Sequence, residues 1–132
     1  MSPGIRLQVR QRALDRCEYC RMPQSGTVLP HEVDHIRSQK HGGQSTLENL
    51  CWACAWCNVF KGTDVAAYPP DSDQLVPLFN PRTDAWSDHF FWEGAVLHGK
   101  TGIALATIEL LRINQPERTN HRQLLLQLGL WA

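Results

Sequence analysis

The chain has 132 residues, of which 42% are hydrophobic and 20% charged, and its formal net charge is +0. This length suits one small domain, with room for a small core and an extension, and the neutral balance argues weakly against a protein that coats nucleic acid. The sequence has no apolar run of the roughly 18 residues that a membrane span needs, and no apolar segment typical of a secretory signal near its start. We therefore expect a protein that meets no membrane and works in a reducing compartment, the cytoplasm.

The first half of the chain is predicted to alternate short elements with loops. A proline at the third position favours a helix over residues 4–16. Residues 28–36 are predicted to form a strand, and residues 45–50 a short capped turn. A further helix is expected over residues 58–68, ended by Pro69 and Pro70.

The second half contains no obvious metal-binding or nucleophilic cluster. The sequence predicts a short strand over residues 75–79, a turn of helix over residues 86–90 and a hairpin whose turn is Glu93-Gly94. Two helices should follow, one from Thr101 to about residue 113 and one from Pro116 to about residue 129. We divide the chain into residues 1–68 and an extension of residues 69–132 that packs on them as one compact unit.

Two cysteine pairs give the strongest chemical signal. Cys17 and Cys20 form one CxxC pair, and Cys54 and Cys57 form another, 33 residues further on. Four thiolates at this spacing are typical of a closed, structural Zn²⁺ site, which would join two distant segments of a small domain. The fifth cysteine, Cys51, fits neither pair and is expected in the core. A redox role for the pairs is the weakest alternative.

Between and beside these pairs lie the side chains that phosphodiester hydrolysis needs. Histidine side chains titrate near neutral pH and can activate water, which suits His35, while Asp34 can bind a hard cation. The amide oxygen of Asn58, directly after the last cysteine, could be a second oxygen ligand. Lys61, one helical turn further, could meet a phosphate as a point charge. Taken one by one, each of these residues also has an ordinary surface or capping role.

These motifs, CEYC, VDHI, HGGQSTLENL and CAWCNVFKG, together closely resemble the HNH endonucleases, in the variant with a cysteine zinc ribbon. The resemblance covers about residues 16–62. It implies an α+β fold with a ββα-metal core, in which a two-stranded hairpin and a helix surround a catalytic cation. The second half also looks like the tail of small bacterial HNH proteins.

The resemblance also implies roles for single residues. His35 would be the general base, and Asp34 and Asn58 the ligands of the catalytic cation. Asn49 would brace the loop and orient His35. Oxygen ligands favour Mg²⁺ or Mn²⁺ at this site. The expected products carry 5′-phosphate and 3′-hydroxyl ends.

DNA, in the nucleoid, is the expected partner, with RNA left open. Up to Gly62 the chain has eight basic and five acidic residues, a net charge of +3, and the remainder carries −3. We expect Arg37, Lys40 and Lys61 to approach phosphate; an arginine-rich face of the first helix, with Arg6, Arg10 and Arg12, could do the same. His31 and His41 could add ligands or phosphate donors, and Phe91, Trp92 and Trp131 could stack on bases.

The competing hypothesis is a non-catalytic zinc-ribbon module that binds nucleic acid or protein. Oligomeric state is open, and a monomer is expected to nick.

Overall fold

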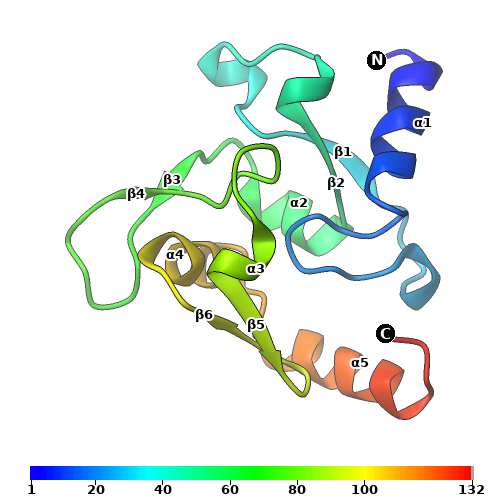
Figure 1. The fold of residues 1–132 in the computed structure, drawn as a ribbon, viewed down its shortest axis with the longest axis vertical. Helices are drawn as coiled ribbons and strands as arrows, with labels where there is room; N and C mark the ends of the chain where they lie inside the picture. Colours follow the sequence, from blue (N-terminus) through cyan, green and yellow to red (C-terminus); the bar gives the residue numbers. More distant parts are fainter. Residues whose placement is uncertain (132) are drawn as a thin grey trace.

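The computed structural model describes residues 1–131 and combines short helices with three two-stranded antiparallel sheets (Figure 1). This mixed arrangement confirms the predicted α+β class. Within the described residues, no helix is long and apolar enough to cross a membrane.

A hairpin followed by a helix forms the centre of the first half. Strands β1 (Glu32–His35) and β2 (Leu50–Ala53) pair antiparallel, with Asp34 opposite Cys51 and His35 opposite Leu50. Helix α2 (Ala55–Lys61) follows β2 directly, and helix α1 (Pro3–Arg12) packs on β2. Three short 3-10 turns complete this half: η1 (Gln24–Gly26), η2 (Gln39–His41) and η3 (Leu47–Asn49). The order β1, β2, α2 is the ββα arrangement that the resemblance implies.

Several predicted boundaries are wrong for local reasons. Helix α1 ends at Arg12 instead of residue 16, because Leu14 and Asp15 adopt left-handed conformations with φ of 54° and 55°. The strand expected over residues 28–36 is confined to β1. Helix α2 starts at Ala55 instead of residue 58 because the sulfur of Cys54 caps it, accepting the N–H of Cys57. It ends at Lys61 because Gly62, with φ of 52°, turns the chain away.

The second half surrounds a second hairpin. Strand β3 (Ala66–Ala67) pairs with β4 (Val76–Pro77). The strand expected over residues 75–79 is therefore limited to the two residues of β4. Helix α3 (Trp86–His89) leads into β5 (Phe90–Glu93) and β6 (Val96–Gly99), and the predicted hairpin is confirmed. Helices α4 (Gly102–Leu110) and α5 (Pro116–Gln127) follow, and Thr101 caps α4 as expected.

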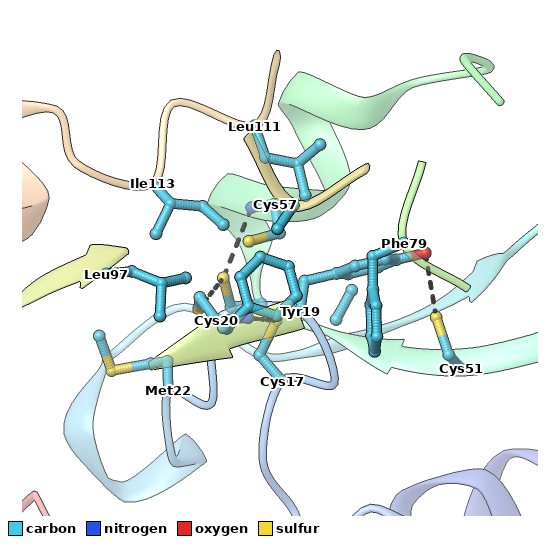
Figure 2. Close-up of a cluster of buried hydrophobic side chains, with 14 of the residues drawn as sticks. Cys17, Tyr19, Cys20, Met22, Cys51, Cys57, Phe79, Leu97, Leu111 and Ile113 are labelled. Atoms are coloured by element: carbon cyan, nitrogen blue, oxygen red, sulfur yellow. Dashed lines mark hydrogen bonds between the residues drawn. The ribbon is translucent and has the colours of Figure 1, made fainter. Parts of the chain in front are cut away.

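One hydrophobic core is shared by the two halves. The four paired cysteines and Tyr19 from the first half pack in the same cluster as side chains from the second half (Figure 2). The second half contributes Phe79, Phe90, Leu97, Leu111, Ile113 and Leu125 to this cluster. A smaller cluster lies under α1 and contains Val9, Ala13, Leu50 and Trp52. The position of the cysteines at the centre of the main cluster makes them part of the core of the whole chain.

Candidate metal centre and active site

The two cysteine pairs converge on one point inside the molecule. Cys17, Cys20, Cys54 and Cys57 are all buried, and their sulfur atoms lie within 4.8 Å of one another. The Cys20 and Cys54 sulfurs are 3.6 Å apart, close to the roughly 3.8 Å edge of a tetrahedron with Zn–S bonds of about 2.3 Å. In each pair the first sulfur accepts the N–H of the second cysteine, at 3.5 Å for Cys20 and 3.4 Å for Cys57. The cluster could therefore hold zinc.

The same burial sets the protonation of the cysteines. Burial raises the pKa values of Cys17 and Cys57, whereas hydrogen bonds from the other cysteines lower the pKa of Cys20. A soft divalent cation would displace the thiol protons of these cysteines, since its ligands are thiolates. Zinc at this position would join the segment after α1 to the start of α2.

Asp34 takes part in a buried polar network. Its carboxylate accepts the hydroxyl of Tyr19 at 2.8 Å and faces the Lys61 ammonium at 3.1 Å, and all three side chains are buried. Cys51, also buried, lies 3.4 Å from the Tyr19 oxygen and 3.6 Å from Asp34. Burial raises the pKa of Tyr19, and the neighbouring Cys51 and Asp34 add to this shift, so the phenol stays protonated and donates. Tyr19, between the first two zinc-site cysteines, thus connects that site to Asp34.

His35 lies at the end of β1, partly exposed. Its Nε2 is 2.8 Å from the hydroxyl oxygen of Ser45, which belongs to the loop between η2 and η3. Ser45 was not among the predicted site residues, because a lone serine in a polar loop gives no signal in the sequence. The hydrogen bond fixes one nitrogen of the ring and leaves Nδ1 for another partner.

Asn49 holds the loop that carries Ser45. Its side-chain oxygen accepts the N–H of Arg37 at 2.9 Å, and its Nδ2 donates to the carbonyls of Arg37 and Gln44, each at 2.9 Å. Within the described residues it makes no hydrogen bond to His35. The expected orientation of His35 by Asn49 is therefore indirect: Asn49 fixes the loop, and Ser45 contacts the ring.

Asp34, His35 and Asn58 line one surface hollow of about 310 Å³, together with Lys40. Consecutive residues of a strand point to opposite faces, yet both Asp34 and His35 reach this hollow because β1 ends at His35. Asn58, in the middle of α2, is half-buried and contributes an amide to the same wall. These three residues, whose side chains are an imidazole, a carboxylate and an amide, line one open space.

The residues expected to contact phosphate fall into two groups. Lys40 and Arg37 are exposed; Lys40 lines the hollow, and Arg37 lines a separate groove of about 350 Å³ beside β4. Lys61 is only 1% exposed and also donates to the His35 carbonyl at 3.0 Å. The prediction that Lys61 contacts phosphate is therefore corrected, because its ammonium group is buried and paired inside the molecule.

The other candidates have mostly structural partners. His31 is fully buried, and its Nε2 donates to the Met22 carbonyl at 2.8 Å, so it is not a ligand at the hollow. His41 is exposed and lines the groove beside β4. The arginines of α1 also have local partners: Glu32 for Arg6, Asp15 for Arg10, and the carbonyls of Leu47 and Leu50 for Arg12. Trp92 and Trp131 pack edge to face, and Phe91 stacks on His98.

Comparison with known proteins agrees with the motifs in the sequence. A family model described as HNH endonuclease matches residues 17–64, which confirms the resemblance found in the motifs. The chain is also similar to the Septu protein PtuB of Bacillus thuringiensis, with 27% identity over 126 residues that cover 94% of this chain and 46% of that protein. The chain thus spans just under half the length of this curated relative. No solved structure gives a significant match.

Proposed function

We propose that this protein is a metal-dependent endonuclease that hydrolyses phosphodiester bonds in DNA, because residues 17–64 match a family model described as HNH endonuclease. The observation that carries the proposal is the hollow in which His35, Asp34 and Asn58 meet. A water molecule, an oxygen of the phosphate and these three side chains can share such a space.

In this proposal His35 is the general base. This role requires the tautomer in which Nε2–H donates to Ser45 Oγ, 2.8 Å away, and the lone pair of Nδ1 accepts a proton of the attacking water. Ser45 acts as a positioning residue, since it holds the ring but does not touch the substrate. Asn49 supports it by bracing the loop.

Asp34 and Asn58 would hold the catalytic cation. Their oxygens suit Mg²⁺ or Mn²⁺. Lys61 Nζ lies 3.1 Å from Asp34 Oδ2 and 3.4 Å from Oδ1, and Asn58 lines the same hollow. When bound, such a cation offsets the negative charge on the phosphate and on the leaving oxygen. Lys61 neutralises Asp34 in the free protein. The two ligands alone should therefore bind a cation weakly and depend on the phosphate of the substrate for the rest of its coordination.

The four cysteines would hold a separate, structural Zn²⁺. A closed shell of thiolates leaves no position for water or substrate. Lys40, exposed at the rim of the hollow, and Arg37 are the cations best placed to approach the phosphate backbone. One such site would cut one strand at a time, so a monomer would nick duplex DNA.

Nicking of supercoiled plasmid tests the proposal. Wild-type protein is expected to nick with Mg²⁺ or Mn²⁺ and to stop in EDTA, and His35→Ala should lower the rate by about 100-fold or more, as loss of a general base does. His41→Ala is the matched control, because this exposed histidine lies outside the hollow.

Folding of each variant is checked by zinc content and circular dichroism. Wild-type nicking rates in zinc-loaded His35→Ala would refute the mechanism. Zinc-loaded wild type that binds DNA or protein but cuts neither DNA nor RNA would favour a binding module instead.

A further inference from the structure

The last helix reaches the cysteine cluster from a distant part of the sequence. Arg118, in the first turns of α5, is only 4% exposed. Its Nη2 lies 3.2 Å from the sulfur of Cys57 and 3.8 Å from that of Cys54, while Nη1 donates to the Leu111 carbonyl at 2.7 Å. One guanidinium thus bridges the backbone after α4 and two of the four thiol ligands.

Arg122, one turn further along α5, is a second buried cation in this region. It is 1% exposed, and it donates to the carbonyls of Ala95 and Ile113, both at 2.8 Å. Its Nη1 has no hydrogen-bond partner among the described residues. Burial lowers the pKa of Arg122, and the Cys20 thiolate opposes this shift.

The charges of these groups are complementary. Four thiolates around one Zn²⁺ carry a net charge of −2, and a buried net charge is costly unless it is paired. Burial alone would lower the pKa of Arg118, but the thiolates of Cys57, Cys20 and Cys54 raise it, so the guanidinium stays charged. Arg118 contributes one positive charge within hydrogen-bond distance of the cluster.

We propose that α5 supplies the outer shell of the metal centre. Arg118 donates charge-assisted hydrogen bonds to the Cys57 and Cys54 thiolates and offsets part of the negative charge of the zinc tetrathiolate. Hydrogen bonds to thiolate reduce its basicity and hold it in position, so this shell retains the metal. The inference concerns metal binding only and does not depend on the proposed nuclease activity.

Zinc release from the chain of 132 residues tests this role. Arg118→Met keeps much of the side-chain volume but removes the charge and the donors, and it should release zinc to a chelator about 10- to 100-fold faster than wild type. Arg118→Lys keeps the charge without the planar fork and should fall between the two. Arg112→Met is the matched control, since this exposed arginine packs over the Phe60 ring and should leave the rate unchanged.

Equal release rates for wild type and a folded Arg118→Met would overturn the proposal. If Arg118→Met does not fold, NMR of the wild-type chain loaded with ¹¹³Cd decides. Scalar coupling between ¹¹³Cd and an arginine side-chain proton is expected across the N–H···S bond. Resolved buried arginine protons without such coupling would also overturn it.

Discussion

Asp34 depends on a donor that comes from the turn between Cys17 and Cys20. The Tyr19 hydroxyl donates to the carboxylate at 2.8 Å, and both side chains are buried, at 0% and 5% exposure. Tyr19→Phe removes this donor and leaves the carboxylate with Lys61 as its main partner. Hydrogen bonds to charged groups contribute about 1.5–3 kcal/mol, so unfolding by denaturant should show a loss of that order.

The same substitution should also lower the rate of nicking, because Asp34 would no longer be held toward the hollow. Tyr68→Phe is the control, since Tyr68 is 57% exposed and should change neither stability nor rate. Unchanged stability in Tyr19→Phe would show that Lys61 alone is sufficient to hold Asp34.

Ser45 gives a second prediction for single residues. Its hydroxyl oxygen is the hydrogen-bond partner of His35 Nε2, at 2.8 Å, and the pair is exposed to water, which can replace part of the bond. A hydrogen bond of about 0.5–1.5 kcal/mol corresponds to a loss of roughly two- to tenfold in nicking rate for Ser45→Ala. Ser45→Thr keeps the hydroxyl and should restore most of the rate.

Thr46→Ala is the neighbouring control, as Thr46 makes no side-chain cap bond to η3. A merely structural effect of Ser45 would lower the melting temperature together with the rate. The positioning role requires a lower rate at an unchanged melting temperature.

Among the elements, those marked by strong local signals were predictable from the sequence. The Glu93-Gly94 turn between apolar residues predicted the second hairpin, and Thr101 and Pro116 predicted the starts of α4 and α5. The end of α1 and the start of α2 were missed because non-glycine residues in left-handed conformations decide the first and a cysteine cap decides the second. Neither signal can be distinguished from chance in a single sequence.

The loop between β1 and β2 is held by a close approach that only glycine permits. A Cβ on Gly43 would lie 1.7 Å from the Arg37 carbonyl oxygen and 2.9 Å from Asn49 Nδ2. Gly43→Ala must therefore push apart the contacts that fix the loop carrying Ser45, at a cost of about 1–3 kcal/mol. Nicking should fall further than in Ser45→Ala, and the melting temperature should fall with it.

Gly4→Ala is the opposite case at a helical glycine. No atom lies within 4 Å of a Cβ on Gly4 in α1, so alanine should stabilise the chain by about 0.5–1 kcal/mol.

A Gly43→Ala variant as stable and active as wild type would mean that the loop can hold His35 in more than one conformation.

For the whole molecule, the sequence indicated the ligands but not what surrounds them. The two CxxC pairs are recognisable by their spacing, and the structure brings the four cysteines together. The Asp34-His35 pair is a weak signal by itself and gained its weight from the resemblance to the HNH endonucleases; both residues line one hollow. Lys61 pairs inside the molecule with Asp34, 27 residues away, and Arg118 contacts Cys57, 61 residues away. Both contacts depend on packing between distant segments. Long-range contacts of this kind leave no periodic pattern, so an isolated lysine or arginine is most simply predicted to lie at the surface.

The shared core leads to a prediction for the two halves of the chain. Residues 1–68 contain all four zinc-site cysteines and the whole hollow, but the cysteines pack against Phe79, Leu97, Leu111 and Leu125 of the second half. A fragment of residues 1–68 would expose this apolar surface and lose Arg118. It should hold zinc at least about tenfold more weakly than the full chain, and its unfolding should not be cooperative.

Zinc content after dialysis against a weak chelator and thermal unfolding followed by circular dichroism measure both effects. Adding residues 69–132 as a separate polypeptide should restore part of the zinc retention, since the lost contacts are not covalent. A 1–68 fragment that keeps one zinc and unfolds cooperatively would instead make the first half an independent domain. Its nicking rate would then show whether the extension contributes to cleavage at all.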